Sequence, residues 1–179
     1  MPASRNSALK PASALLDKKA HGDLAMLVVE DAAHMASIVC GILKSMGVGK
    51  IYEARNGDDA LNILAHYPVN VVLIDNLEPP LDGLAVVKTV RTAQSQFPKS
   101  VPVIYMTAVA SKSAVIAARD AGVTEVLSKP FSAAQLIARI ESVLNKPRSL
   151  VQSEAFVGPD RRRKEKVPSE RKRQADRSK

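Results

Sequence analysis

The stretch Val71-Val72-Leu73-Ile74-Asp75 decides the fold that we expect for this chain. Four consecutive apolar residues, three of them β-branched, predict a strand that is buried on both faces. The strand ends at a carboxylate, and the Pro79-Pro80 pair that follows prevents the strand from continuing. In open α/β sheets, ligands bind at the carboxyl ends of the strands. Asp75 is therefore the first candidate for a functional residue.

The alternation of a short apolar run and an amphipathic helix is repeated along residues 24–145. Strands that alternate with helices predict a parallel sheet with right-handed crossovers and helices on both faces. The expected fold class is α/β, a doubly wound, five-stranded parallel sheet flanked by five helices. The expected strands cover residues 24–29, 51–54, 71–75, 101–106 and 123–128. The expected helices cover residues 33–46, 58–67, 83–93, 111–121 and 132–144.

The composition excludes several classes of protein. Cys40 is the single cysteine, so neither an intrachain disulfide nor a cysteine zinc site can form, and its apolar neighbours predict a buried thiol. With 46% hydrophobic but only 3% aromatic residues, we expect one domain with an aliphatic core. No apolar run approaches the ~18 residues of a membrane span, and residues 1–23 lack the apolar segment of a secretory signal. We expect a cytoplasmic protein without membrane insertion.

The positive charge is concentrated near the C-terminal end of the sequence. The net charge is +8; residues 146–179 contain twelve Lys or Arg against five Asp or Glu, whereas residues 1–145 contain fourteen against thirteen. This distribution predicts a nearly neutral globular domain at residues 24–145 and a basic, disordered tail at residues 146–179. Residues 1–23 are expected to be a flexible leader.

Charged and hydroxyl side chains stand at the ends of four expected strands: Glu30 and Asp31, then Asp75, Thr107 and Lys129. Because the carboxyl ends of parallel strands share one edge, these side chains should lie together. Three carboxylates repel one another unless a cation lies among them. Oxygen ligands without His or Cys favour a hard ion such as Mg²⁺. Asp31 and Asp75 are the expected direct ligands, with Glu30 acting through water.

The hydroxyl of Thr107 and the ammonium of Lys129 are donors suited to a phosphoryl group. A carboxylate can itself be the nucleophile, giving an aspartyl phosphate, and a metal ion can orient the transferring group. Each of these residues could also have a purely structural role. Glu30 and Asp31 could cap a helix or lie in its first turn, and Asp75 could cap a loop. Thr107 could stabilise a turn, and Lys129 could be a solvated surface charge. The joint occurrence at four strand ends favours a phosphate site.

These features resemble a response-regulator receiver domain of the CheY-like superfamily, over residues 24–145 or about two thirds of the chain. The resemblance implies a flavodoxin-like strand order of 2-1-3-4-5. The matching segments are Leu27-Val28-Val29-Glu30-Asp31, Ala54-Arg55-Asn56-Gly57-Asp58-Asp59-Ala60-Leu61, Val72-Leu73-Ile74-Asp75, Pro79, Asp82-Gly83, Pro102-Val103-Ile104, Met106-Thr107-Ala108, Ala121-Gly122-Val123 and Leu127-Ser128-Lys129-Pro130-Phe131.

The resemblance assigns roles to the residues of this edge. It implies that Asp75 accepts a phosphoryl group from a histidine kinase or a histidine phosphotransfer protein. Asp31, Asp75 and the backbone carbonyl of Leu77 would hold Mg²⁺, with Glu30 in support.

The resemblance also implies that Thr107 and Lys129 contact the phosphoryl oxygens and that the bond between Lys129 and Pro130 is cis. Such a domain catalyses only its own phosphorylation and dephosphorylation and is not otherwise an enzyme.

Three residues depart from the family pattern. Val126 stands where the family usually has an aromatic residue that moves with the threonine, so the usual aromatic switch is in doubt. Leu77, two residues after the phosphoacceptor, is expected to lie in line with the phosphoryl group and to slow attack by water. Glu78 replaces a usual Met and adds a charge beside the site.

The output is expected to be an altered protein–protein contact with an unknown downstream protein. Residues 146–179 leave no room for a DNA-binding output domain of ~50 residues, and the expected contact face includes Arg119, Val126 and Gln135.

The alternative is an adaptor in which the receiver is a scaffold and Arg161, Arg162, Arg163 and Lys164 bind an anionic ligand. Three anionic ligands fit this charge: cyclic di-GMP, nucleic acid and an acidic protein. Arginine-rich tails of some similar receivers bind cyclic di-GMP. A tail that only increases solubility is also compatible with the charge.

Overall fold

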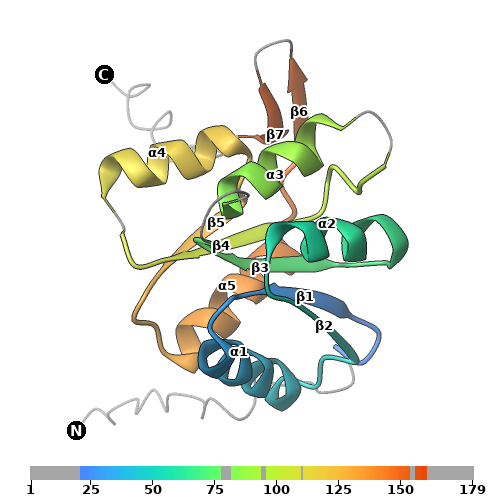
Figure 1. Ribbon diagram of the computed structural model, residues 1–179, viewed down its shortest axis with the longest axis vertical. Helices are drawn as coiled ribbons and strands as arrows, with labels where there is room; N and C mark the ends of the chain where they lie inside the picture. The colour runs from blue at the N-terminus through green and yellow to red at the C-terminus, as the bar shows by residue number, and fades with distance from the viewer. Residues whose placement is uncertain (1–20, 78–81, 94–95, 110, 154–155, 161–179) are drawn as a thin grey trace, which may run out of the picture.

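The computed structural model describes residues 21–77, 82–93, 96–109, 111–153 and 156–160. Its centre is a parallel sheet with the strand order β2-β1-β3-β4-β5 (Figure 1). The predicted number and order of strands are therefore confirmed. The strands are β1 (Ala25–Val29), β2 (Lys50–Ala54), β3 (Val71–Asp75), β4 (Val103–Thr107) and β5 (Glu125–Ser128).

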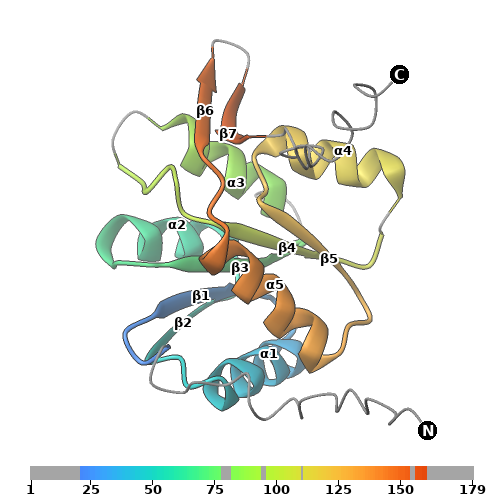
Figure 2. The same cartoon turned by 180° about the vertical axis from the view of Figure 1, so that it is seen from behind.

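Five helices cover the two faces of the sheet, as predicted (Figures 1 and 2). They are α1 (Ala33–Ser45), α2 (Gly57–His66), α3 (Gly83–Thr92), α4 (Lys112–Ala121) and α5 (Ala133–Asn145). α1 and α5 pack on one face, and α2, α3 and α4 pack on the other. Within the described segments, no helix is long and apolar enough to cross a membrane.

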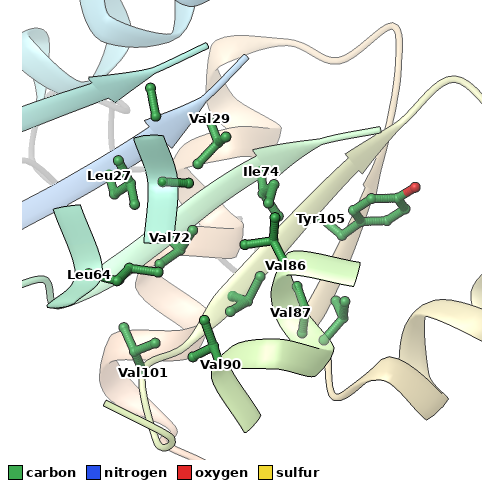
Figure 3. Close-up of a cluster of buried hydrophobic side chains, with 14 of the residues drawn as sticks. Leu27, Val29, Leu64, Val72, Ile74, Val86, Val87, Val90, Val101 and Tyr105 are labelled. Carbon is green, nitrogen blue, oxygen red and sulfur yellow. The ribbon is translucent and has the colours of Figure 1, made fainter. Parts of the chain in front are cut away.

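Strand β3 lies at the middle of the sheet and is buried on both faces. Val72 and Ile74 join the apolar cluster on the α2–α4 side (Figure 3), while Val71 and Leu73 join the cluster beneath α1 and α5. A continuous apolar run, rather than an alternating one, is what such a strand requires. The second cluster also contains Cys40, and burial raises the pKa of its thiol to about 11. The predicted buried thiol is confirmed.

A pair of strands follows α5, and the prediction of a disordered tail is wrong for residues 150–153 and 156–159. β6 (Leu150–Ser153) pairs with β7 (Phe156–Pro159) in an antiparallel arrangement, and β7 contacts α3 and α4. Two four-residue strands contain no apolar period long enough to be recognised in a sequence. The basic cluster at residues 161–164 lies outside the described residues.

The hairpin packs where the ends of α3 and α4 meet, around the buried side chain of Arg91. Arg91 is 1% exposed, and it donates from Nε to the Gly122 carbonyl (3.1 Å) and from Nη1 to the Lys99 carbonyl (2.6 Å). Gly122 ends α4 in the left-handed region, with φ of 95°. A Cβ there would lie 2.8 Å from Arg91 Cγ and 3.1 Å from the carbonyl oxygen of Val157. Gly122 therefore allows α3, α4 and β7 to approach one another closely.

Gly122→Ala is expected to lower the free energy of unfolding by about 2 kcal/mol, because a left-handed conformation is costly for a residue with a Cβ and this Cβ would meet close neighbours. Urea denaturation measures the change. Gly41→Ala is the matched control: Gly41 lies within α1, its Cβ would meet nothing within 4 Å, and this substitution should stabilise the protein by roughly 0.5–1 kcal/mol. Equal effects of the two substitutions would contradict the role assigned to Gly122.

Candidate phosphoryl-transfer site

The register of the sheet brings the strand ends together at one edge. Val29 pairs with Ile74, and Asp75 pairs with Met106. Glu30 therefore follows β1 beside Asp75, the last residue of β3. A Cβ at Gly83 would collide with the Asp75 carbonyl, so glycine at this position lets the start of α3 lie directly against the end of β3.

The predicted acidic residues form a cluster at this edge. Glu30, Asp31 and Asp75 each place a carboxylate oxygen within 4.8 Å of the others. Glu30 is 2% exposed, Asp75 is partly buried and Asp31 is exposed. Burial raises the pKa of Glu30, and the nearby charge of Asp75 raises it further, although the hydrogen bond from Lys129 partly offsets both. The cluster therefore concentrates negative charge where a cation would relieve the repulsion.

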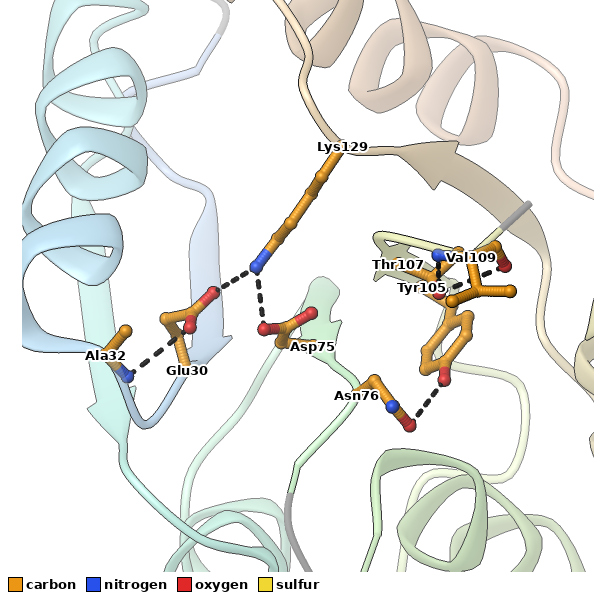
Figure 4. Close-up of polar contacts among 8 residues, drawn as sticks. All are labelled: Glu30, Ala32, Asp75, Asn76, Tyr105, Thr107, Val109 and Lys129. Atoms are coloured by element: carbon orange, nitrogen blue, oxygen red, sulfur yellow. Dashed lines mark hydrogen bonds and ion pairs between the residues drawn. The ribbon is translucent and has the colours of Figure 1, made fainter.

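Lys129 connects two members of this cluster (Figure 4). Its Nζ donates to Asp75 Oδ2 at 2.6 Å and to Glu30 Oε2 at 2.9 Å. Burial alone would lower the pKa of Lys129, but the hydrogen bonds and charges of Asp75 and Glu30 outweigh it, so the pKa is raised. Lys129 is thus a protonated donor positioned against the expected phosphoacceptor. The peptide bond from Lys129 to Pro130 is cis, as predicted.

Thr107 lies at the end of β4, and its hydroxyl contacts its own loop. The Val109 N–H donates to Thr107 Oγ1 (3.1 Å), and Oγ1 donates in turn to the Val109 carbonyl (3.3 Å). The backbone N–H of Lys129 donates to the Thr107 carbonyl at 2.8 Å, which ties the ends of β4 and β5 together. The hydroxyl belongs to the same edge, but its hydrogen bonds are to Val109 and not to Glu30 or Asp75 (Figure 4).

The contacts of these residues differ from those of helix caps. α1 begins after Ala32 without a side-chain cap and without an acid in its first turn, so Glu30 and Asp31 are not its N-cap. The cap of α3 is Asp82, whose Oδ1 accepts from the Ala85 N–H at 2.7 Å. Thr107 has the turn contact expected from a structural role, and Glu30 Oε1 also accepts a longer local bond from the Ala32 N–H, at 3.4 Å. Lys129 in addition contacts both Glu30 and Asp75, so these contacts join the ends of β1, β3 and β5.

The placement of Leu77 differs from the prediction. Its side chain is 4% exposed and belongs to the apolar cluster on the α2–α4 side of the sheet. Its N–H donates to the Asp75 carbonyl at 3.0 Å, so the chain turns sharply after β3. The expectation that the Leu77 side chain lies in line with the phosphoryl group is therefore wrong. An apolar side chain at a core margin is more stable when packed than when it covers a charged site.

Leu77→Asn is accordingly expected to lower the free energy of unfolding by about 2 kcal/mol, because a buried leucine is lost and an amide is placed in an apolar cluster. Chemical denaturation at neutral pH measures this loss. Leu84→Asn, at a half-buried position of the same cluster, should cost less. A fully stable Leu77→Asn variant would show that the side chain is not packed as described.

One contact of this edge was not predicted from the sequence. The hydroxyl of Tyr105 donates to Asn76 Oδ1 at 2.9 Å (Figure 4). From the sequence, Tyr105 is predicted only as a residue of the fourth strand. One feature of the sequence could have indicated this contact: Tyr105 is an aromatic residue with a hydroxyl in an otherwise aliphatic strand. A buried tyrosine needs a hydrogen-bond partner for its hydroxyl.

The remaining predicted residues are placed as follows. Val126 lies on β5 and is the register partner of Tyr105. Glu78 and the tail residues Arg161, Arg162, Arg163 and Lys164 lie outside the described residues.

Comparison with known proteins gives consistent matches over this α/β domain. The model of the response regulator receiver domain family matches residues 26–141. Chemotaxis protein CheY1 of Helicobacter pylori is 36% identical over 120 residues, which cover 66% of this chain and 95% of the relative. Chemotaxis protein CheY-3 of Vibrio cholerae is 30% identical over 124 residues, covering 69% and 94%.

Solved structures agree with the sequence relatives. The receiver domain of the Francisella response regulator 1452 superposes with a TM-score of 0.63 at 27% identity, covering 69% of this chain and 98% of that one. The receiver domain of sensor histidine kinase PA1611 from Pseudomonas aeruginosa has a TM-score of 0.62 at 26% identity, with the same coverage. That structure has a magnesium ion coordinated in its active-site cleft.

Proposed function

The chain belongs to the response regulator receiver domain family, and on this premise we propose that Asp75 accepts a phosphoryl group from a histidine kinase or a histidine phosphotransfer protein. The observation that carries the proposal is the position of Asp75 between a cluster of carboxylates and the ammonium of Lys129. A nucleophilic carboxylate needs an accessible oxygen and nearby positive charge to receive an anionic group. Asp75 has both.

The donor set fits Mg²⁺. Three carboxylate oxygens lie within 4.8 Å of one another, and hard oxygen ligands without nitrogen or sulfur are those that Mg²⁺ takes. Asp31, Asp75 and the Leu77 carbonyl would hold the ion, and Glu30 would support it. When bound, the ion would neutralise charge on the phosphoryl group and orient it.

The residues of the chain then act as follows. A carboxylate oxygen of Asp75 forms a bond to phosphorus while the bond from phosphorus to the donor imidazole nitrogen breaks, and the electron pair of that bond stays on the imidazole. Lys129 exchanges its contact with Asp75 Oδ2 for a phosphoryl oxygen, and the Thr107 hydroxyl leaves the Val109 carbonyl to donate to another. Both donors are already held at this edge of the sheet before the phosphoryl group arrives.

We further propose that the product is a signal rather than a released metabolite, so the protein is not an enzyme for external substrates. Phosphorylation would alter contacts with a downstream protein at the face formed by α4, β5 and α5. A hollow of about 380 Å³ between β5 and α5, lined in part by Val126, Gln135 and Arg139, supports this choice of face.

The alternative role of the basic tail can be tested without disturbing the domain. Because β7 packs on α3 and α4, a chain ending at Asp160 removes the basic cluster but keeps the hairpin. Titration of cyclic di-GMP against this shortened chain and the full chain would separate tail binding from domain binding. Equal affinities, or none, would rule out the tail as the binding segment.

The phosphorylation proposal is tested by incubating the full chain with acetyl phosphate and Mg²⁺ and locating the modified residue by mass spectrometry after proteolysis. We expect one phosphoryl group on the peptide that contains Asp75. Modification elsewhere, or none in the presence of Mg²⁺, would overturn the proposal and shift weight to the adaptor role.

A further inference from the structure

Tyr105 is a buried aromatic residue that contacts the loop directly after the expected phosphoacceptor. It is 5% exposed, and its ring packs within the apolar cluster on the α2–α4 side of the sheet. Figure 3 shows Tyr105 at the margin of this cluster, with its hydroxyl pointing away from the aliphatic side chains. The hydroxyl reaches Asn76, which follows Asp75 in the chain.

The ring has little freedom to leave this position. A Cβ at Gly83 would lie 3.3 Å from Tyr105 Cε2, so the ring lies against the start of α3. On the sheet, Tyr105 pairs with Ile74 of β3 and with Val126 of β5. The hydroxyl is thereby fixed relative to three strands and one helix, and it can restrain the residue that it contacts.

The electrostatic surroundings keep this hydroxyl a donor. Burial raises the pKa of Tyr105, and the nearby charges of Asp75 and Asp82 raise it further, although the neighbouring Thr107 side chain offsets part of this rise. The protonated hydroxyl therefore donates to Asn76 Oδ1 throughout the physiological pH range.

Asn76 is placed to transmit this restraint to the site. It lies between Asp75, an expected metal ligand and nucleophile, and Leu77, whose backbone carbonyl is the other expected ligand from this loop. Leu77 is itself anchored by its buried side chain and by its N–H bond to the Asp75 carbonyl. The contact from Tyr105 to Asn76 therefore restrains the part of the loop that lies between two anchored neighbours.

We propose that Tyr105 is a positioning residue of the phosphorylation site, which holds Asn76 and thereby orients the Asp75–Leu77 backbone for the metal ion. This inference rests on the proposed function, because it concerns the metal ion that phosphoryl transfer would use. It adds a residue on β4 that touches neither the metal ion nor the phosphoryl group.

The test is a double-variant cycle with Tyr105→Phe and Asn76→Ala, in which Mg²⁺ affinity of the full chain is measured by calorimetry. Tyr105→Phe keeps the packed ring and removes only the hydroxyl. We expect each single variant to bind Mg²⁺ about fivefold more weakly, the loss of one neutral hydrogen bond, and the double variant to bind no more weakly than either. Tyr52→Phe, on the edge strand β2, is the matched control and should bind as the wild type does.

A spectroscopic measurement separates positioning from general stability. The chain has three tyrosines and no tryptophan, so ultraviolet emission reports on Tyr52, Tyr67 and Tyr105 alone. Mg²⁺ with beryllofluoride should change this emission in the wild type and in Tyr52→Phe but not in Asn76→Ala, which keeps the Tyr105 fluorophore and removes its hydrogen-bond partner. Wild-type Mg²⁺ affinity in Tyr105→Phe, or additive losses in the double variant, would overturn this inference alone. Absence of Mg²⁺ binding by the wild type would overturn the proposed function together with it.

Discussion

Asp75→Asn is expected to abolish phosphorylation by acetyl phosphate in the presence of Mg²⁺. An amide lacks the charged oxygen that attacks phosphorus, so the initial rate should fall at least about a thousandfold, as when a nucleophile is removed from a catalytic unit. The substitution also removes one of the three carboxylates of the cluster, which should weaken Mg²⁺ binding. Mass spectrometry of the intact protein in acid-quenched samples measures the rate.

The same variant should remain folded, which makes the loss interpretable. Asparagine has nearly the size of aspartate, and its Oδ1 can still accept from Lys129. The negative charge of Asp75 is one of the causes, after burial, of the raised pKa of Glu30, and its removal relieves that repulsion. We expect the free energy of unfolding at pH 7 to be unchanged or slightly higher.

Asp82→Asn is the matched control for Asp75→Asn. Asp82 is exposed and caps α3, a role that asparagine fulfils equally well. This variant should be phosphorylated at the wild-type rate. Equal impairment of both variants, or phosphorylation of Asp75→Asn, would contradict the assignment of the phosphoacceptor.

The central features of the fold could be predicted because burial leaves a direct pattern in the sequence. Strand β3 is shielded on both faces, so its apolar run is continuous. The strand-end residues could be predicted as a group, since parallel connectivity alone places Glu30, Asp75 and Lys129 at one edge. Element ends were less certain: β4 begins at Val103 rather than Val101, because the intervening Pro102 has no N–H to donate to the ladder.

Features that depend on side-chain direction could not be predicted in this way. Leu77 was placed beside the phosphoryl group, but the turn after Asp75 directs its side chain into the core. The bond between Tyr105 and Asn76 joins residues 29 positions apart, and no local pattern encodes it. The β6–β7 hairpin packs against α3 and α4 through β7, and an isolated two-stranded hairpin depends on such packing for its stability. Its two four-residue strands are too short to show an apolar pattern in the sequence.

Lys129→Met is expected to lower the free energy of unfolding by about 3 kcal/mol at pH 7 in the absence of Mg²⁺. The Glu30 side chain is 1% exposed and would lose the cation that it contacts, and removal of one partner from a buried ion pair typically costs 3–5 kcal/mol. We take the lower end because the Lys129 side chain is 17% exposed. Lys112→Met, at an exposed position of α4, should change stability by less than about 0.5 kcal/mol.

The pH dependence of this loss identifies its electrostatic origin. Burial raises the pKa of Glu30 above its ordinary value of 4.5, and the hydrogen bond from Lys129 opposes that rise. Without Lys129 the pKa should rise further, and a protonated Glu30 needs no cation. The deficit of Lys129→Met should therefore be small below pH 4.5 and should grow as the pH rises through the raised pKa of Glu30.

At high pH the deficit should shrink again. The pKa of Lys129 is raised above its ordinary value of 10.5 by its hydrogen bonds to Asp75 and Glu30, which outweigh the opposing effect of burial. The stability that the ammonium contributes is complete below pH 10.5 and is lost as the pH passes through the raised value. Urea denaturation of the wild type and Lys129→Met at pH 4, 7 and 9 would follow the rising part of this curve. A deficit of equal size at pH 4 and pH 7 would indicate lost packing of the lysine stem rather than an unpaired buried carboxylate.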